Sequence, residues 1–299
     1  MATPHPGTGS QTPGVGMALT AAALFGVSGV VALDAFDQVS AVTMTQFRTL
    51  ATALILGVLA VRRPVSIRRH LGGLTLLGGF LAAVTITYYV AIQRLGMGPG
   101  VTIQFLGPAL VLVWMRLVQH RPVPAAAWAA AAIAVAGTGL MNEAWDLPAS
   151  DPVGILAGLG AAVTFAGYLV VGERLGRSLP AMTVGAVSFG VAAVIWLAIE
   201  PPGLPQLTPG VWGQLVWVAV AGTALPFLLE LAALRRSDPG RIGVVATAEP
   251  VVGAAAAWLA LGQALSWVQV FGGVLVVIGI SIIQLVTRSL APDVPDLVV

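Results

Sequence analysis

The stretch WVQVFGGVLVVIGISIIQLVT, residues 267–287, contains no charged side chain. A helix rises about 1.5 Å per residue, so a segment of this length crosses the ~30 Å hydrocarbon core of a bilayer. Helices of soluble proteins average only about 10–14 residues. The stretch therefore predicts a membrane-spanning helix.

Similar apolar runs recur along the 299 residues, separated by charged residues, proline or glycine. About ten can be counted, and at about 20 residues each they occupy about two thirds of the chain. They leave no segment between them long enough to bury a core of its own. We expect an all-α integral membrane protein with spans near residues 15–33, 41–61, 71–92, 100–118, 124–141, 153–172, 182–199, 210–231, 241–261 and 267–287.

The composition excludes most other classes of protein. Hydrophobic residues make up 58% of the chain and charged residues 9%, whereas a soluble domain has about 25% charged residues. The chain has no cysteine, which removes disulfides, thiolate catalysis and cysteine-bound metals. It has no nucleotide-binding loop, and a net charge of +2 spread over loops is no nucleic-acid-binding patch. We therefore expect no cofactor, no enzymatic activity and no nucleic-acid partner.

The arginines predict the orientation, because short arginine-rich loops stay in the cytoplasm. With strictly alternating spans, one side receives Arg94 and six of the twelve acids, and Arg48 falls within a span. This predicts an even number of spans with both termini cytoplasmic. The absence of lysine beside many alanines and glycines is typical of a GC-rich bacterial genome, so we expect a bacterial inner membrane. The twelve arginines on the other side are Arg62, Arg63, Arg68, Arg69, Arg116, Arg121, Arg174, Arg177, Arg235, Arg236, Arg241 and Arg288.

The two halves of the chain resemble each other. Gly107-Pro108 corresponds to Glu249-Pro250, and Gly137 corresponds to Gly279 at the same offset. Five spans per half force the second half to enter from the opposite side, although glycine- and proline-rich helices can also resemble one another by composition alone. Inverted repeats with helices broken at matching prolines, here Pro108 and Pro250, are typical of secondary transporters. We expect repeats at residues 15–141 and 153–287, a disordered tail at 1–14 and a cytoplasmic tail at 288–299.

Three charged residues fall inside predicted spans, where charge is costly and therefore points to function. Glu249 precedes a proline that frees a backbone carbonyl, which suits a cation, an ammonium group or a proton. Arg48 suits a substrate carboxylate; its alternative role is a structural ion pair with Glu249 or Glu230. Glu230 lies near the cytoplasmic arginines and has an interfacial ion pair as its alternative role. Softer candidates are Thr85, Thr87, Tyr88, Tyr89, Thr102, Gln104, Thr164, Tyr168, Thr223 and Thr247.

Several of these motifs together resemble a known family. Thr223-Ala224-Leu225-Pro226, Glu230, the run from Asp238 to Gly243, Ala248-Glu249-Pro250 and Gln104-Phe105-Leu106-Gly107-Pro108 are similar to the EamA family of the drug/metabolite transporter superfamily. Within it they resemble most closely the RhtA-type threonine/homoserine exporters, which Arg48, Tyr168 and Glu173-Arg174 also fit. The chain departs from that pattern at Gln104 and Gln263, where those proteins often carry glutamate. The resemblance implies ten spans, a central cavity between the repeats, alternating access and no cofactor.

The sequence thus predicts a secondary transporter that exports a small polar metabolite, with an amino acid such as threonine or homoserine as the expected substrate, driven by proton uptake. Glu249 would bind substrate or couple the proton, and Arg48 would hold a carboxylate or set the field of the pathway. Gln104, Tyr168 and Tyr88 would line the cavity. An alternative is efflux of drugs or lipophilic cations, and a remote one is a membrane scaffold or embedded enzyme. The oligomeric state is left open.

Overall fold

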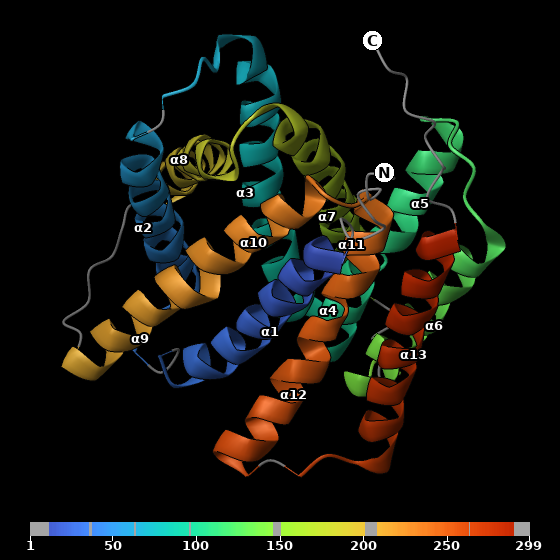
Figure 1. Ribbon diagram of the computed structural model, residues 1–299. Helices are drawn as coiled ribbons and strands as arrows, with labels where there is room; N and C mark the ends of the chain where they lie inside the picture. Colours follow the sequence, from blue (N-terminus) through green and yellow to red (C-terminus); the bar gives the residue numbers. More distant parts are fainter. Residues whose placement is uncertain are drawn as a thin grey trace, which may run out of the picture.

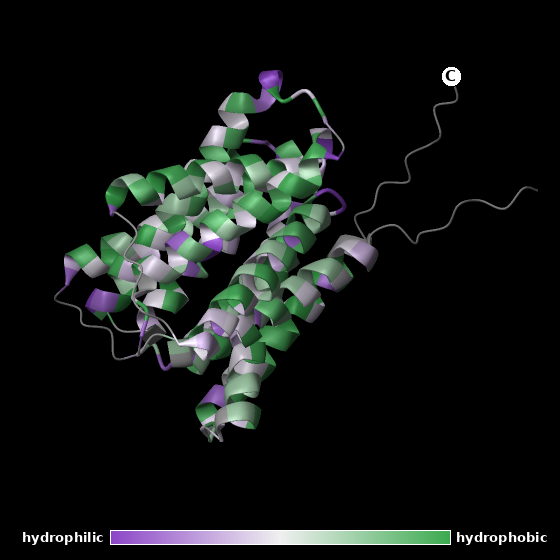
Figure 2. Ribbon diagram, turned by 90° about the vertical axis from the view of Figure 1, so that its left-hand side faces the viewer, coloured by the Kyte–Doolittle hydropathy of each residue, from purple (hydrophilic) through white to green (hydrophobic). Residues whose placement is uncertain are grey.

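The computed structural model describes residues 12–35, 38–62, 64–95, 97–145, 151–200, 208–262 and 264–289, and their regular structure is helical (Figure 1). Within these ranges, nine helical segments are long and apolar enough to cross a membrane, and a tenth apolar helix is shorter. Figure 2 shows mainly apolar ribbon along the helices, with hydrophilic segments at their ends and a few within the bundle. The predicted all-α membrane fold is confirmed.

Seven of the expected spans are continuous helices. Most of the helices whose boundaries differ from expectation are longer, although α6 is one residue shorter. Helix α1 starts at Thr12 rather than residue 15, because Pro13 is well tolerated in a first helical turn. The expected terminal tails otherwise fall at residues 1–11 and 290–299, outside the described residues. The continuous helices are α1 (Thr12–Ala35), α2 (Ala41–Val61), α3 (Leu71–Leu95, after the short 3-10 helix η1, Arg68–His70), α6 (Ala125–Met141), α7 (Pro152–Ser178), α8 (Ala181–Ile199) and α13 (Trp267–Ser289).

The other three spans are interrupted, each close to a proline. The fourth divides into α4 (Met97–Gln104) and α5 (Gly107–Leu117), and the ninth into α11 (Pro239–Ala246) and α12 (Ala248–Leu261). The eighth consists of α9 (Pro209–Ala219), a π-helical turn η2 (Val220–Ala224) and α10 (Leu225–Leu234). Proline lacks an N–H and its ring clashes with the carbonyl one turn earlier, so the regular hydrogen-bond ladder stops there.

The helix packing repeats when the two halves of the chain are exchanged. Helix α3 packs on α7 and α8, and its counterpart in the second half, the α9–α10 span, packs on α1 and α2. Two further pairs, α2 with α8 and α6 with α13, each join a helix to its own counterpart. Two inverted five-helix repeats give this arrangement.

The same symmetry is present at the level of single contacts between α6 and α13. A Cβ atom on Gly137 would lie 2.6 Å from the carbonyl oxygen of Gly272, and one on Gly279 would lie 2.8 Å from that of Ala130. Gly279 and Gly272 stand at one common offset from Gly137 and Ala130, so these are one contact seen from the two repeats. Small residues let the backbones of membrane helices approach closely, and here they join the halves.

The connections rich in arginine lie toward one side of the bundle. In Figure 1 the α2–α3, α5–α6 and α7–α8 connections are on the upper side, whereas the α1–α2 and α12–α13 connections are on the lower side. The cytoplasmic location of the arginine-rich side remains a prediction.

Candidate functional site

A cavity of about 500 Å³ lies between the two repeats. Its walls include the six side chains that the sequence singled out for a substrate or ion pathway, contributed by α2, α3 and α4 of the first repeat and α7, α10 and α12 of the second. These residues are far apart in sequence, and the fold brings them to one space. They are Arg48, Tyr88, Gln104, Tyr168, Glu230 and Glu249.

Small residues of α1 give the cavity its room along one wall. Ala18, Ala22 and Ala32 line it, and Gly26 brings α1 against α12 so closely that a Cβ atom there would lie 2.6 Å from the carbonyl oxygen of Glu249. The position of Glu249 therefore depends on the absence of a side chain at Gly26 of α1.

Glu230 and Tyr168 form a buried pair. The Tyr168 hydroxyl donates to Oε2 of Glu230 at 2.9 Å, and the two residues are only 2% and 5% exposed, respectively. No ion pair to Glu230 is found in the described part of the chain. Glu230 thus faces the cavity with a tyrosine partner rather than a cytoplasmic arginine.

Arg48 has a different environment. Its Nε is buried without a hydrogen-bond partner, and among the described residues no ion pair joins it to Glu230 or Glu249. Arg48, Tyr88 and Glu249 nevertheless lie close enough to interact electrostatically. The described part of the structure therefore has no direct ion pair between Arg48 and either acid. The guanidinium faces the cavity with at least one N–H donor that lacks a partner in this part of the chain.

The breaks in the fourth and ninth spans lie beside two of these residues. Gln104 is the last residue of α4, and Pro108 stands in the first turn of α5. Glu249 is the second residue of α12, with Pro250 directly after it. Unpaired N–H groups at a helix start favour negative charge, so the start of α12 is a suitable place for a carboxylate.

Sequence comparison adds the family. The EamA-like transporter family matches residues 12–143 and again 152–285. The chain belongs to the EamA-like transporter family. As an EamA protein it is a multi-pass membrane protein of a transporter family whose two matches coincide with the two repeats.

Several relatives of this EamA protein have names. It is 31% identical over 196 residues to "Threonine/homoserine exporter RhtA" of Salmonella typhimurium and 30% identical over 198 residues to that of Escherichia coli K12. Each match covers 64% of this chain and 63% or 64% of the exporter, so it spans less than two thirds of either protein. The "Uncharacterized transporter YwfM" of Bacillus subtilis is 25% identical over 91% of this chain and 93% of its own.

A solved crystal structure shares the fold of this EamA protein. Its TM-score is 0.81 at 20% identity, covering 95% of this chain and 100% of the other. At this identity the likeness extends to the fold alone.

An aromatic cluster in the EamA cavity was missed by the sequence analysis. The ring centroid of Phe227 lies 5.0 Å from that of Phe25, 4.8 Å from that of Phe189 and 5.6 Å from that of Tyr168, each edge to face. Phe227 follows Pro226 one turn before Glu230, and that spacing was a usable signal. Aromatic edges and faces give the cavity a rigid apolar wall beside a carboxylate.

Most of the threonine candidates are occupied by their own helices. Hydroxyl groups bonded in this way are poor candidates for substrate contact. Tyr89 is also engaged, since its hydroxyl lies 2.8 Å from Oγ1 of Thr45. The threonines that donate to a carbonyl three to five residues earlier are Thr85, Thr87, Thr164, Thr223 and Thr247. Two other hydroxyl residues, Ser28 and Thr49, line the cavity and were missed.

No resident metal is suggested by the described ranges, which contain no group of three or more histidine, cysteine or acidic side chains able to hold an ion. The groups that line the cavity include one guanidinium, two carboxylates, tyrosine and other hydroxyls and two amides. These groups can bind and exchange charged or hydrogen-bonding solutes.

Proposed function

We propose that this protein exports an amino acid, such as threonine or homoserine, across a bacterial inner membrane by alternating access, in exchange for protons. One observation carries the proposal: a guanidinium with a buried, unpartnered Nε and two carboxylates, Glu230 and Glu249, face one cavity of about 500 Å³. A zwitterion needs both signs of charge in one space. The named relatives, whose curated name is threonine/homoserine exporter, support the same substrate class.

Arg48 would receive the substrate carboxylate. Its guanidinium is planar and can present two parallel N–H donors to a carboxylate. Because the described residues give it no competing ion pair, substrate binding would satisfy a buried donor rather than break an existing bond. Gln104 and Tyr88 line the same cavity and would bond the remaining polar atoms of the substrate.

Glu249 would hold either the substrate ammonium group or a proton. One carboxylate cannot hold both at once, so proton binding from one side of the membrane displaces the amino acid to that side. This competition produces exchange without a separate ion site. In the predicted orientation, with both termini and the arginine-rich connections in the cytoplasm, the proton gradient drives the substrate outward.

The test uses purified protein in liposomes with an imposed pH gradient and radiolabelled threonine or homoserine. We expect wild-type protein to move the amino acid against its gradient and Glu249→Gln to abolish coupled movement while still inserting. A matched control is Glu200→Gln, which makes the same acid-to-amide change at an exposed residue outside the cavity lining. Unchanged transport by Glu249→Gln would remove Glu249 from the mechanism, and no amino-acid movement by the wild type would refute the proposal.

The aromatic cluster around Phe227 favours a second candidate, efflux of lipophilic cations. Aromatic faces attract cations, and Glu230 lies one helical turn away on α10. This function has no use for a guanidinium. Arg48→Ala separates the two candidates: it should abolish amino-acid export, whereas a cation exporter would tolerate it.

A further inference from the structure

Several residues that line the cavity are more exposed at one end than those at the other. Lining residues near the α1–α2 and α3–α4 connections are accessible, since Gln93 is exposed and Val42 and Val101 are half-buried. At the arginine-rich end the lining residues Ala18 and Ile242 are 3% and 0% exposed. A transporter that works by alternating access must be able to open the less exposed end.

Close helix packing fills the space beyond the less exposed end. Gly172 and Gly176 of α7 face α10 and the residue that follows it. A Cβ atom on Gly172 would lie 3.0 Å from the side chain of Leu234, and one on Gly176 would lie 2.9 Å from that of Arg235. On the other side, a Cβ atom on Gly240 of α11 would lie 2.7 Å from Leu112 of α5. This packing leaves little room for a solute, but apolar contacts between membrane helices are individually weak.

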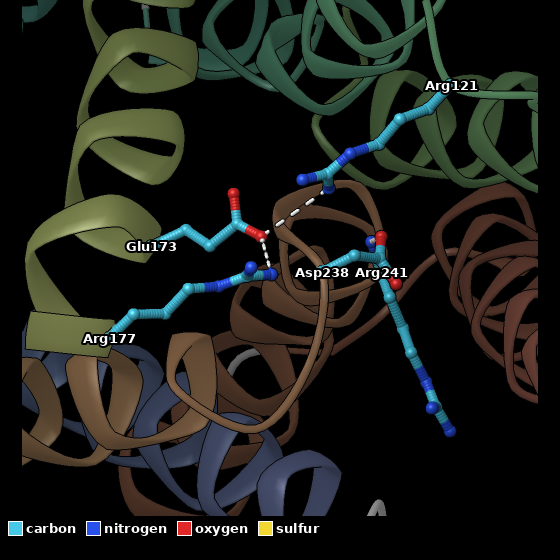
Figure 3. Close-up of polar contacts among 5 residues, drawn as sticks. All are labelled: Arg121, Glu173, Arg177, Asp238 and Arg241. Atoms are coloured by element: carbon cyan, nitrogen blue, oxygen red, sulfur yellow. Dashed lines mark hydrogen bonds and ion pairs between the residues drawn. The ribbon is translucent and has the colours of Figure 1, made fainter. Parts of the chain in front are cut away.

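An ion pair joins the two repeats near the arginine-rich end of the cavity (Figure 3). Glu173 is five residues beyond Tyr168 on α7, or about 7.5 Å further along the helix axis, and it is 2% exposed. Its Oε1 lies 3.6 Å from Nη1 of Arg121 and 2.6 Å from Nη2 of Arg177. Arg121 belongs to the α5–α6 connection of the first repeat, whereas Glu173 and Arg177 are both on α7 of the second.

A neighbouring pair of residues fixes the adjacent helices. Asp238 caps α11 by accepting from the N–H of Arg241 at 2.8 Å, and the Arg241 side chain points away from Glu173 (Figure 3). Nε of Arg241 donates to Oε1 of Gln284 on α13 at 2.9 Å. The Asp238–Arg241 and Arg241–Gln284 contacts stay within the second repeat, whereas the Glu173–Arg121 ion pair joins the two repeats.

We propose that Glu173 and Arg121 are the inner gate of the cavity: their ion pair across the repeats holds the arginine-rich end closed and breaks when that end opens. The proposal rests on the cavity being the transport route. A buried carboxylate strongly favours retaining its cationic partners, so the closed state gains from the contact. When the repeats separate, Glu173 keeps Arg177, which moves with it on α7, and the charge is never left without a partner.

The absence of cysteine from the chain allows a direct test, because any introduced thiol is the sole site of labelling. Ala18→Cys places a reporter on the lining at the arginine-rich end. In vesicles of known orientation, a charged, membrane-impermeant thiol reagent is added from the arginine-rich side. We expect slow labelling when the gate is intact, and labelling faster by about five- to thirtyfold with Arg121→Gln, the change that 1–2 kcal/mol produces in an equilibrium.

Arg177→Gln is the matched control, because it removes the shorter of the two ion pairs but leaves the contact between repeats. We expect it to keep labelling slow, and Arg121→Lys, which keeps the charge, to do the same. Equal acceleration by Arg121→Gln and Arg177→Gln, or none with Arg121→Gln, would overturn the gate. Arg121 is 40% exposed, so its replacement is compatible with folding, which a single peak on size exclusion would verify.

The labelling test requires no substrate, so its result is separate from the amino-acid assay. Failure of threonine transport would refute the proposed substrate and leave the gate measurement valid. Uniform slow labelling beside normal threonine transport would refute the gate alone.

Discussion

Replacing Gly137 with alanine tests the contact that joins the two repeats. The new Cβ atom would lie 2.6 Å from the carbonyl oxygen of Gly272 and 2.8 Å from the amide nitrogen of Val276, both backbone atoms that cannot rotate away. An ordinary contact begins near 3.4 Å, so α13 must move by about 0.8 Å relative to α6. Overpacking of this kind costs about 1–3 kcal/mol.

Alanine also favours the helix over glycine by about 0.5–1 kcal/mol, so we expect a net loss of about 1–2 kcal/mol in the free energy of unfolding. Gly79→Ala on α3 is the matched control, because nothing lies within 4 Å of its added Cβ atom. It should be neutral or stabilising. Gly279→Ala, the repeat counterpart at 2.8 Å from a carbonyl oxygen, should lose stability by a smaller amount than Gly137→Ala.

The assay is reversible unfolding in mixed detergent micelles with increasing dodecyl sulfate, followed by circular dichroism. The expected order of stability places Gly79→Ala highest, then Gly279→Ala, then Gly137→Ala. If Gly137→Ala were as stable as Gly79→Ala, the close backbone approach between the repeats would be refuted.

Three further changes test other contacts. Gly26→Ala should push α1 away from the carbonyl of Glu249 and lower threonine uptake by liposomes at normal expression, whereas full uptake would show that this approach is dispensable. Tyr168→Phe removes a 2.9 Å hydrogen bond from buried Glu230 and should cost about 1–3 kcal/mol, so an unchanged melting temperature would contradict it. The pKa of the Asp151 carboxyl is lowered, mainly because the carboxylate accepts a hydrogen bond from a backbone N–H in the first turn of α7. The hydrogen bond from that N–H to the Asp151 carboxylate therefore stabilises the fold above the ordinary pKa of 3.8, and this stabilisation is lost as pH falls through the lowered pKa. The difference in melting temperature between wild type and Asp151→Ala should shrink from pH 7 to about pH 3. A constant difference would refute this.

Helix placement was predictable because it depends on local properties of the chain. Residues 267–287 have the length and apolar character to span a bilayer wherever they are placed, and the structure has α13 there. Pro108 and Pro250 interrupt their spans because proline lacks an N–H in any context. Charged residues inside a span were equally predictable as functional candidates, since the free energy cost of placing a charge in hydrocarbon does not depend on the neighbouring helix.

The partners of those charges were not predictable in this way. Glu230 was expected beside cytoplasmic arginines or in the pathway, and it bonds Tyr168 across the cavity. Glu173 was noted from sequence only as part of the resemblance to the RhtA-type exporters, and in the structure it is 2% exposed and joins the two repeats through Arg121. The rotation of each helix about its axis decides these contacts, and helices that are apolar all round carry little information about that rotation.

The sequence by itself determined that this chain spans a membrane, that it has two related halves and that Arg48, Glu230 and Glu249 stand out as charged candidates within the spans. Those properties follow from the cost of placing polar groups in hydrocarbon, which each segment meets independently. Only the tertiary structure decided that six helices bring the six candidate side chains to one cavity and that the Nε of Arg48 has no hydrogen-bond partner among the described residues. These depend on glycines such as Gly26 and Gly137, which set how closely particular helices approach, and that distance belongs to a pair of helices rather than to either sequence alone.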